Sequence, residues 1–102
     1  MEDAPFESIL EMMKVCYARC FDASDHERQQ LTTGIFWLAD CLEQHVTVMK
    51  IPTLSHAIAS ISDLRDMANN LFKGKSQWVG TDKFNSECYR LLASDSPANF
   101  EG

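Results

Sequence analysis

Thiol and imidazole groups are the side chains of this 102-residue chain that could do chemistry. Cys16 and Cys20 lie four residues apart, a spacing that places both thiols on one face of a helix. Four other residues are of the types that could complete a metal site: His26, His45, Cys41 and Cys88. Structural zinc sites usually carry a Cys-x-x-Cys pair, however, and reduced cysteine is a common small residue of hydrophobic cores. We therefore expect the cysteines to pack in the core, with no metal and no cofactor.

Nucleophilic catalysis is not indicated either. A catalytic cysteine needs a base that takes its proton in a water-excluding cleft, and the spacing of His26, His45 and His56 ties none of them to a thiol. The chain also lacks a glycine-rich phosphate loop, an HExxH motif and a nucleophile elbow. These observations favour a protein that is not an enzyme.

Composition and charge further restrict the class of protein to which this chain can belong. The hydrophobic fraction of 45% and the charged fraction of 24% are typical of a globular protein. The net charge of −6 and the absence of a Lys/Arg stripe argue against direct nucleic-acid binding, because affinity for phosphate comes from basic side chains. There is no signal-peptide pattern and no apolar run of the roughly 20 residues that cross a bilayer. The sequence therefore predicts a cytoplasmic protein with no membrane contact and with reduced thiols.

The best-defined element is a long central helix, predicted from Ser24 to Met49. Ser24 and Glu27 have the spacing of a capping box at its start, and Pro52 follows its end. Apolar residues recur inside it at spacings of three and four, which form one stripe on a helix: Leu31, Ile35, Leu38, Leu42, Val46 and Met49.

Several residues of this helix lie outside the stripe. Trp37, Cys41 and Val48 widen it to about half of the circumference, so we expect neighbours to cover the helix from two sides. Phe36 lies on the otherwise polar face. Gly34 costs about 1 kcal/mol relative to Ala in a helix interior, and we expect it to allow a tight crossing with a neighbouring helix.

Three more helices are predicted, over residues 5–21, 54–72 and 81–93, while residues 1–4 and 94–102 should fray. The first should run antiparallel to the central helix because their link is short. We expect the first three helices to form the core and the fourth to cap it. The fold class is thus all-α, a single-domain bundle of about four helices over residues 1–102.

Four residues near the third helix carry separate predictions. Gly74 has the placement of a left-handed C-terminal cap. Arg65 projects within an apolar arc, so either its aliphatic stem lies along apolar surface or its guanidinium meets a carboxylate across an interface. Trp78 and Val79 should cover the end of the bundle.

Some apolar side chains remain after each helix has been given a core-facing side: Met12, Val15, Phe36, Trp37, Val48 and Met67. Aromatic anchors inside a polar rim are typical of protein-binding surfaces. We therefore predict a surface for a protein partner, or for a homodimer, on the second helix. Its predicted residues are Phe36, Trp37, Asp40, Glu43, Gln44, Thr47 and Val48.

The stretches GIFWLADCLEQHVTVM and IPTLSHAIASISDLRDMANNLF resemble small acidic all-helical bacterial regulators, in particular the QslA-type quorum-sensing antiactivators of Pseudomonas. The resemblance covers residues 6–92 as an overall pattern. It implies a non-enzymatic protein that binds a LuxR-type transcription factor at its dimerisation surface and so prevents DNA binding. The alternative is an acidic inhibitor that mimics nucleic acid and binds a basic nucleic-acid-binding protein.

Overall fold

Four α-helices make up nearly all of the structure. The computed structural model describes residues 4–49 and 54–95. Its elements are α1 (Ala4–Cys20), α2 (Asp25–Met49), α3 (Leu54–Asn70), the 3₁₀ turn η1 (Lys75–Gln77) and α4 (Thr81–Asp95). The predicted all-α fold is confirmed for these residues, which contain no strand. Fraying was predicted for residues 1–4 and 94–102, but Ala4 belongs to α1 and Ser94 and Asp95 belong to α4, so this prediction is wrong at these three residues. Residues 1–3 and 96–102, and the helix end predicted at Pro52, lie outside the described residues.

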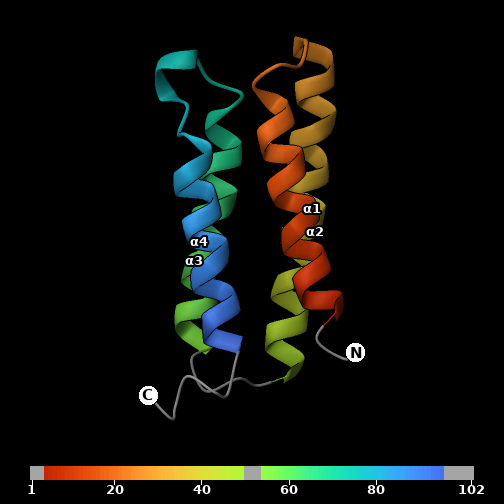
Figure 1. Ribbon diagram of the computed structural model, residues 1–102, viewed down its shortest axis with the longest axis vertical. Helices are drawn as coiled ribbons and strands as arrows, with labels where there is room; N and C mark the ends of the chain where they lie inside the picture. The colour runs from red at the N-terminus through yellow and green to blue at the C-terminus, as the bar shows by residue number, and fades with distance from the viewer. Residues whose placement is uncertain (1–3, 50–53, 96–102) are drawn as a thin grey trace.

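The helices form a ring in which each one packs mainly against two others. α1 packs on α2 and α4, and α3 packs on α2 and α4. Figure 1 shows α1 and α4 in front of α2 and α3, with all four running along the long axis. The predicted role of α4 as a cap is wrong. It is a full member of the bundle, because Phe84, Cys88 and Leu91 are all buried.

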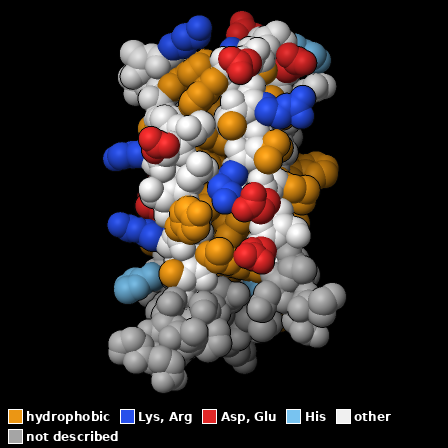
Figure 2. Space-filling view, viewed as in Figure 1, with side chains coloured by type: hydrophobic (Ala, Val, Ile, Leu, Met, Phe, Trp, Pro, Cys, Tyr) orange, Lys and Arg blue, Asp and Glu red, His pale blue; other side chains and the backbone are white. Residues whose placement is uncertain are grey.

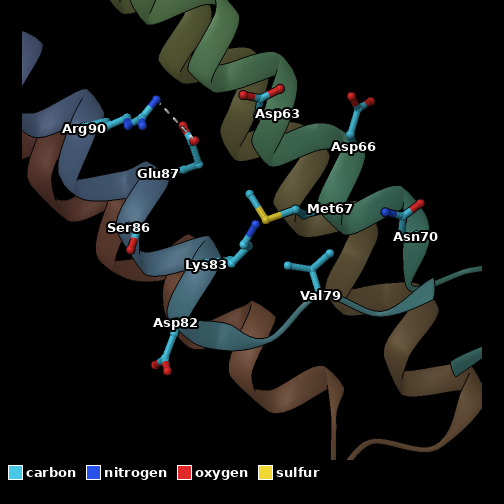
Figure 3. Close-up of a pocket in the computed structure, with 10 residues that line it drawn as sticks. All are labelled: Asp63, Asp66, Met67, Asn70, Val79, Asp82, Lys83, Ser86, Glu87 and Arg90. Carbon is cyan, nitrogen blue, oxygen red and sulfur yellow. Dashed lines mark ion pairs between the residues drawn. The ribbon is translucent and has the colours of Figure 1, made fainter. Parts of the chain in front are cut away.

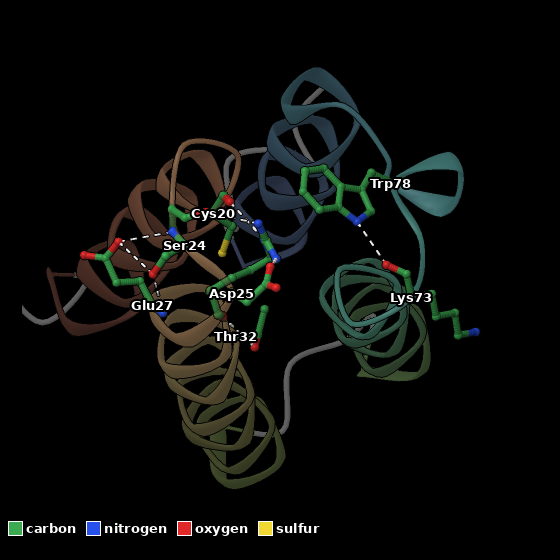
Figure 4. A network of polar contacts seen from close by, with 9 residues as sticks. Cys20, Ser24, Asp25, Glu27, Thr32, Lys73 and Trp78 are labelled. Carbon is green, nitrogen blue, oxygen red and sulfur yellow. Dashed lines mark hydrogen bonds and ion pairs between the residues drawn. The ribbon is translucent and has the colours of Figure 1, made fainter.

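The turn between α1 and α2 is fixed by the predicted capping box. The backbone N–H of Ser24 donates to a carboxylate oxygen of Glu27 (3.2 Å), and the N–H of Glu27 donates to the Ser24 hydroxyl oxygen (3.3 Å). The Arg28 guanidinium donates to the backbone carbonyls of Cys20 (3.2 Å) and Ala23 (3.0 Å). These bonds, several of which appear in Figure 4, tie the end of α1 to the start of α2.

An aromatic cluster closes the same end of the bundle. The buried Tyr17 ring of α1 stacks on Phe84 of α4 at 4.1 Å and meets Phe21 edge-on at 5.4 Å. The Tyr17 hydroxyl donates to the backbone carbonyl of Val79. Trp78 stacks on Phe21 at 5.4 Å, so this connection covers the end of the bundle as predicted.

Both glycine predictions are wrong. Gly74 has φ −61° and ψ 156°, which is extended backbone and not left-handed. After α3 the chain turns through bonds between residues three apart, such as Lys73 N–H to Asn70 carbonyl (3.0 Å). A Cβ added at Gly34 would meet nothing within 4 Å, so no neighbouring helix approaches it closely.

Arg65 links α3 to α2. Its guanidinium forms ion pairs with Asp40 and with Glu43, the second at 2.8 Å. Its side chain is 31% exposed, so these pairs lie at the margin of the interface between the two helices. Of the two predicted roles of Arg65, contact with carboxylates across an interface is the one observed.

Replacing Tyr17 by Phe tests the aromatic cluster. Tyr17→Phe removes the hydrogen bond and leaves the Val79 carbonyl without this donor, while the ring still stacks on Phe84. We expect a loss of roughly 0.5–1.5 kcal/mol in the free energy of unfolding, measured by urea denaturation. Tyr89→Phe is the matched control, because Tyr89 is 66% exposed, and it should change nothing. Equal stability of the two variants would contradict a stabilising role for this bond.

Candidate functional site

Three of the four cysteines are shielded from solvent. Cys20 and Cys88 are buried and Cys16 is partly buried. Burial raises the pKa of the Cys20 thiol to about 11, of the Cys88 thiol to about 12, and that of Cys16 in the same direction. These three thiols therefore stay protonated near neutral pH, which makes them poor nucleophiles and poor metal ligands. In the described ranges no group of three His, Cys, Asp or Glu side chains is placed to hold a metal ion.

The fourth cysteine is an exception to the predicted core packing. Cys41 is exposed on α2, and it lies beside Trp37 and Val48, which are 73% and 76% exposed. These three side chains share the face of α2 that neither α1 nor α3 covers, since the buried residues Ile35, Ala39, Leu42 and Val46 lie on the opposite side. The prediction that neighbours cover Trp37, Cys41 and Val48 is therefore wrong.

A regular strip runs along this uncovered face. Its members follow one another at alternating spacings of four and three residues, and we call them the outer strip: Gln30, Gly34, Trp37, Cys41, Gln44 and Val48. All are exposed except Gly34, which is partly buried. None carries a charge. The spacing of these residues in the sequence is the signal for the strip. The predicted surface left out Gly34 and Cys41 because a packing role was expected for both, and it also left out Gln30.

The strip borders a shallow hollow on the side of α2 that faces α3. The hollow has a volume of about 480 Å³. It is lined by five of the seven residues predicted to bind a partner: Asp40, Glu43, Gln44, Thr47 and Val48. Trp37 lies one helical turn before Asp40 and Cys41. The structure therefore brings six of the seven predicted residues onto one continuous part of α2.

Phe36, the seventh, is placed differently. It is partly buried and packs against the hydrophobic core. Its ring stacks on Phe72, just after α3, with 6.3 Å between the ring centres. Phe72 itself is 46% exposed. Phe36 thus forms part of the contact between α2 and the end of α3, and it offers a partner at most one edge.

The other apolar residues for which the sequence pattern gave no core position differ in their exposure to solvent. Met12 and Val15 on α1 are 50% and 52% exposed, as predicted, whereas Met67 is buried between α3 and α4. On the face formed by α1 and α4, Figure 2 shows hydrophobic side chains among charged and neutral ones. One charged group there, the Lys14 ammonium, lies 5.3 Å from the centre of the Tyr89 ring. This face therefore carries charged groups among its apolar ones, whereas the outer strip carries none.

A second depression lies between α3 and α4 (Figure 3). It has a volume of about 490 Å³, and Met67 points into it from α3. Four acids and two bases line it: Asp63, Asp66, Asp82, Glu87, Lys83 and Arg90. One carboxylate oxygen of Glu87 is buried without a hydrogen-bond partner, and the other lies 3.9 Å from Arg90. The groove is thus acidic, with part of its charge neutralised.

Thiol labelling tests the placement of the cysteines. We expect one rapidly reacting thiol in the folded protein near pH 8, because Cys41 is exposed, whereas Cys20 and Cys88 are buried, Cys16 is partly buried, and burial raises the pKa of all three. The measurement is the time course of reaction with a coloured disulfide reagent, and Cys41→Ser should remove the fast phase. Rapid reaction of two or more thiols in native protein would contradict this placement.

Comparison with known proteins adds no relative. The chain shows no significant match to models of protein families, to curated proteins or to solved structures. A function for this chain must therefore be inferred from its own sequence and surface.

Proposed function

We propose that this chain is a non-enzymatic regulatory protein that binds another protein through the uncovered face of α2 and thereby inhibits it. The observation that carries the proposal is Trp37, a large aromatic side chain that remains 73% exposed near the centre of the uncharged outer strip. Val48, at 76% exposure, continues the strip by three helical turns. Carboxylate, amide and hydroxyl groups of the adjacent hollow supply the polar rim that surrounds such anchors at protein interfaces.

The free energy available from Trp37 is large enough to matter for binding. A Trp side chain offers on the order of 200 Å² of surface. Covering the exposed 73% would remove about 150 Å² from water, which at about 25 cal/mol per Å² is worth about 4 kcal/mol. Association costs reduce this gain, but a single anchor of this size is typical of the residues that dominate an interface.

The class of partner that we propose is a LuxR-type transcription factor, held at its dimerisation surface so that it cannot bind DNA. The support is the resemblance of residues 6–92 to quorum-sensing antiactivators, together with the chemistry of the outer strip. A homodimer surface is more apolar than the rest of a protein, and an uncharged helical strip can imitate half of it. The net charge of −6 disfavours binding of this chain to the DNA itself. In the described part of the chain, no helix has the length and apolar character needed to cross a membrane.

Replacing Trp37 by Ala tests this proposal. Purified wild-type protein, used as bait in a lysate of its native host, should retain a transcription factor identified by mass spectrometry, and retention should persist at high salt because the contact is apolar. Trp37→Ala should reduce the retained amount at least tenfold. The matched control is Tyr89→Ala, which removes a comparably exposed aromatic ring from α4.

Helicity and melting temperature of each variant show whether it is folded. Equal capture by folded Trp37→Ala and wild-type protein would remove the outer strip as the binding site. Capture of an enzyme or a structural protein instead of a transcription factor would remove the proposed partner class.

The alternative, an acidic mimic of nucleic acid, is favoured by one observation, the acidic groove between α3 and α4. Asp63 and Asp66 stand on the α3 side of it, and both are exposed. If this groove binds a basic protein, the double variant Asp63→Asn, Asp66→Asn should lose capture while Trp37→Ala keeps it, and capture should fall steeply as salt rises. If instead Trp37→Ala loses capture and the double variant keeps it, the acidic groove is excluded as the binding site and binding through α2 is supported.

A further inference from the structure

The spacing of the outer strip is that of a coiled-coil seam. Alternating steps of four and three residues carry one side of a helix through successive heptads, which is the repeat by which two helices pack side by side. The buried face of α2 already serves the core of the bundle, so this seam is additional to it. Its six positions contain no charge. Trp37, Cys41 and Val48 supply its apolar positions, while Gln30 and Gln44 are uncharged amides, so the seam offers a second helix a contact that is only partly apolar.

Gly34 suggests the shape of that helix. A glycine in a helix interior is unfavourable relative to Ala, and here the fold does not need it, because a Cβ would meet nothing within 4 Å. On the seam it makes a notch. Trp37 stands three residues further along the same face as the largest projection, 73% exposed. A notch and a projection on one surface make that surface complementary to itself when two copies meet across a two-fold axis.

We infer that a second copy of this chain is an occupant of the outer strip, with the two α2 helices antiparallel and Trp37 of each copy packed over Gly34 of the other. This deepens the proposed function and rests on it for the identity of the binding surface. The dimer covers the surface that the protein partner needs. Self-association and partner binding therefore exclude each other, so the dimer is a resting form and the monomer the inhibitor.

The antiparallel register follows from the same contact. When Trp37 lies opposite Gly34 of the second copy, positions that add up to 71 face each other. Gln30 then faces Cys41 of the second copy, and Glu27 faces Gln44, whose amide can donate to the carboxylate. The largest side chain thus meets the smallest, and Glu27, which precedes the outer strip on the same face, faces an amide and not another acid.

Charge disfavours the next register along the seam. If Trp37 faced Cys41 of the second copy, Asp40 of one chain would lie opposite position 38 of the other. The two Asp40 carboxylates would then be about 3 Å apart along the helix axis. In the proposed register this offset is nine residues, about 13 Å, which exceeds the screening length of roughly 8 Å at physiological salt.

The dimer should be weak enough to exchange with a partner. A contact made by one helix from each copy is smaller than the roughly 800 Å² per partner of a standard stable interface. Two chains that each carry a charge of −6 also repel one another over long range. We therefore expect the dimer to dissociate on dilution, with a dissociation constant in the micromolar range or weaker.

Gly34→Ala separates a structural role of this glycine from a role in association. Sedimentation equilibrium of wild-type protein should show a monomer–dimer equilibrium. Gly34→Ala should raise the melting temperature, because Ala favours helix and its Cβ has free space, and should weaken the dimer at least tenfold, because the Cβ fills the notch. Gly80→Ala is the matched control: a Cβ there is equally free, but the residue lies before α4 and should leave association unchanged.

Cross-linking tests the register. In Gln30→Cys, the new thiol faces the native Cys41 of the second copy, and mild oxidation by copper phenanthroline and oxygen should join the two sulfurs, each losing its proton and one electron to the oxidant. We expect a covalent dimer in Gln30→Cys, little in wild type, and none in Gln30→Cys, Cys41→Ser. Efficient cross-linking of wild type through Cys41 alone would place the two-fold axis at Cys41 and overturn the proposed register.

The outcomes distinguish this inference from the proposed function. A wild-type protein that stays monomeric at millimolar concentration overturns the dimer, whether or not it captures a transcription factor. An unchanged dimer in Gly34→Ala overturns the Trp37–Gly34 contact. If the dimer forms as described but folded Trp37→Ala still captures the transcription factor, the dimer stands and the proposed partner site fails.

Discussion

A helix in a ring of four can be covered by two neighbours and by the core between them, and the organisation of this protein follows from that limit. α2 has 25 residues against 17 in α1 and in α3, and it packs between the two. Its inner side fills the core. Its outer side is covered by none of the other three described helices, although it carries Trp37 and Val48. Apolar surface that the fold cannot cover is available to another molecule, and this is the physical basis of the proposed binding function.

The rest of the fold holds that surface in place. Arg28 anchors the start of α2 to the end of α1, and its guanidinium lies 4.8 Å from the centre of the Trp78 ring. Tyr17 and Phe84 fix α1 against α4, and Arg65 joins α3 to α2. A binding face carried on a helix fixed at several points loses little conformational entropy when a partner docks. Gly34 is an exception among these stabilising features, since it weakens the helix although a Cβ at this position would meet no atom within 4 Å.

Local signals in the sequence predicted the elements well, and long-range placement less well. The Ser24 capping box set the start of α2 correctly because it depends on residues three apart. The all-α fold followed from apolar periodicity. Gly34 and Gly74 were misassigned because a glycine at a helix end or crossing acquires its role from what approaches it, which one sequence does not show. Periodicity likewise put Trp37 near the apolar stripe, but only the positions of α1 and α3 decide that its ring remains outside.

Solvent access to Trp37 in the bound state tests most directly whether the partner binds to the uncovered face of α2. The chain has two tryptophans, so Trp78→Phe leaves Trp37 as the only one and keeps an aromatic ring to stack on Phe21. Quenching of its fluorescence by acrylamide would be measured in dilute protein and again with the captured transcription factor in excess. We expect strong quenching in the free protein and several-fold weaker quenching in the complex. Equal quenching in the two states would show that the partner binds elsewhere, and would contradict α2 as the inhibitory surface.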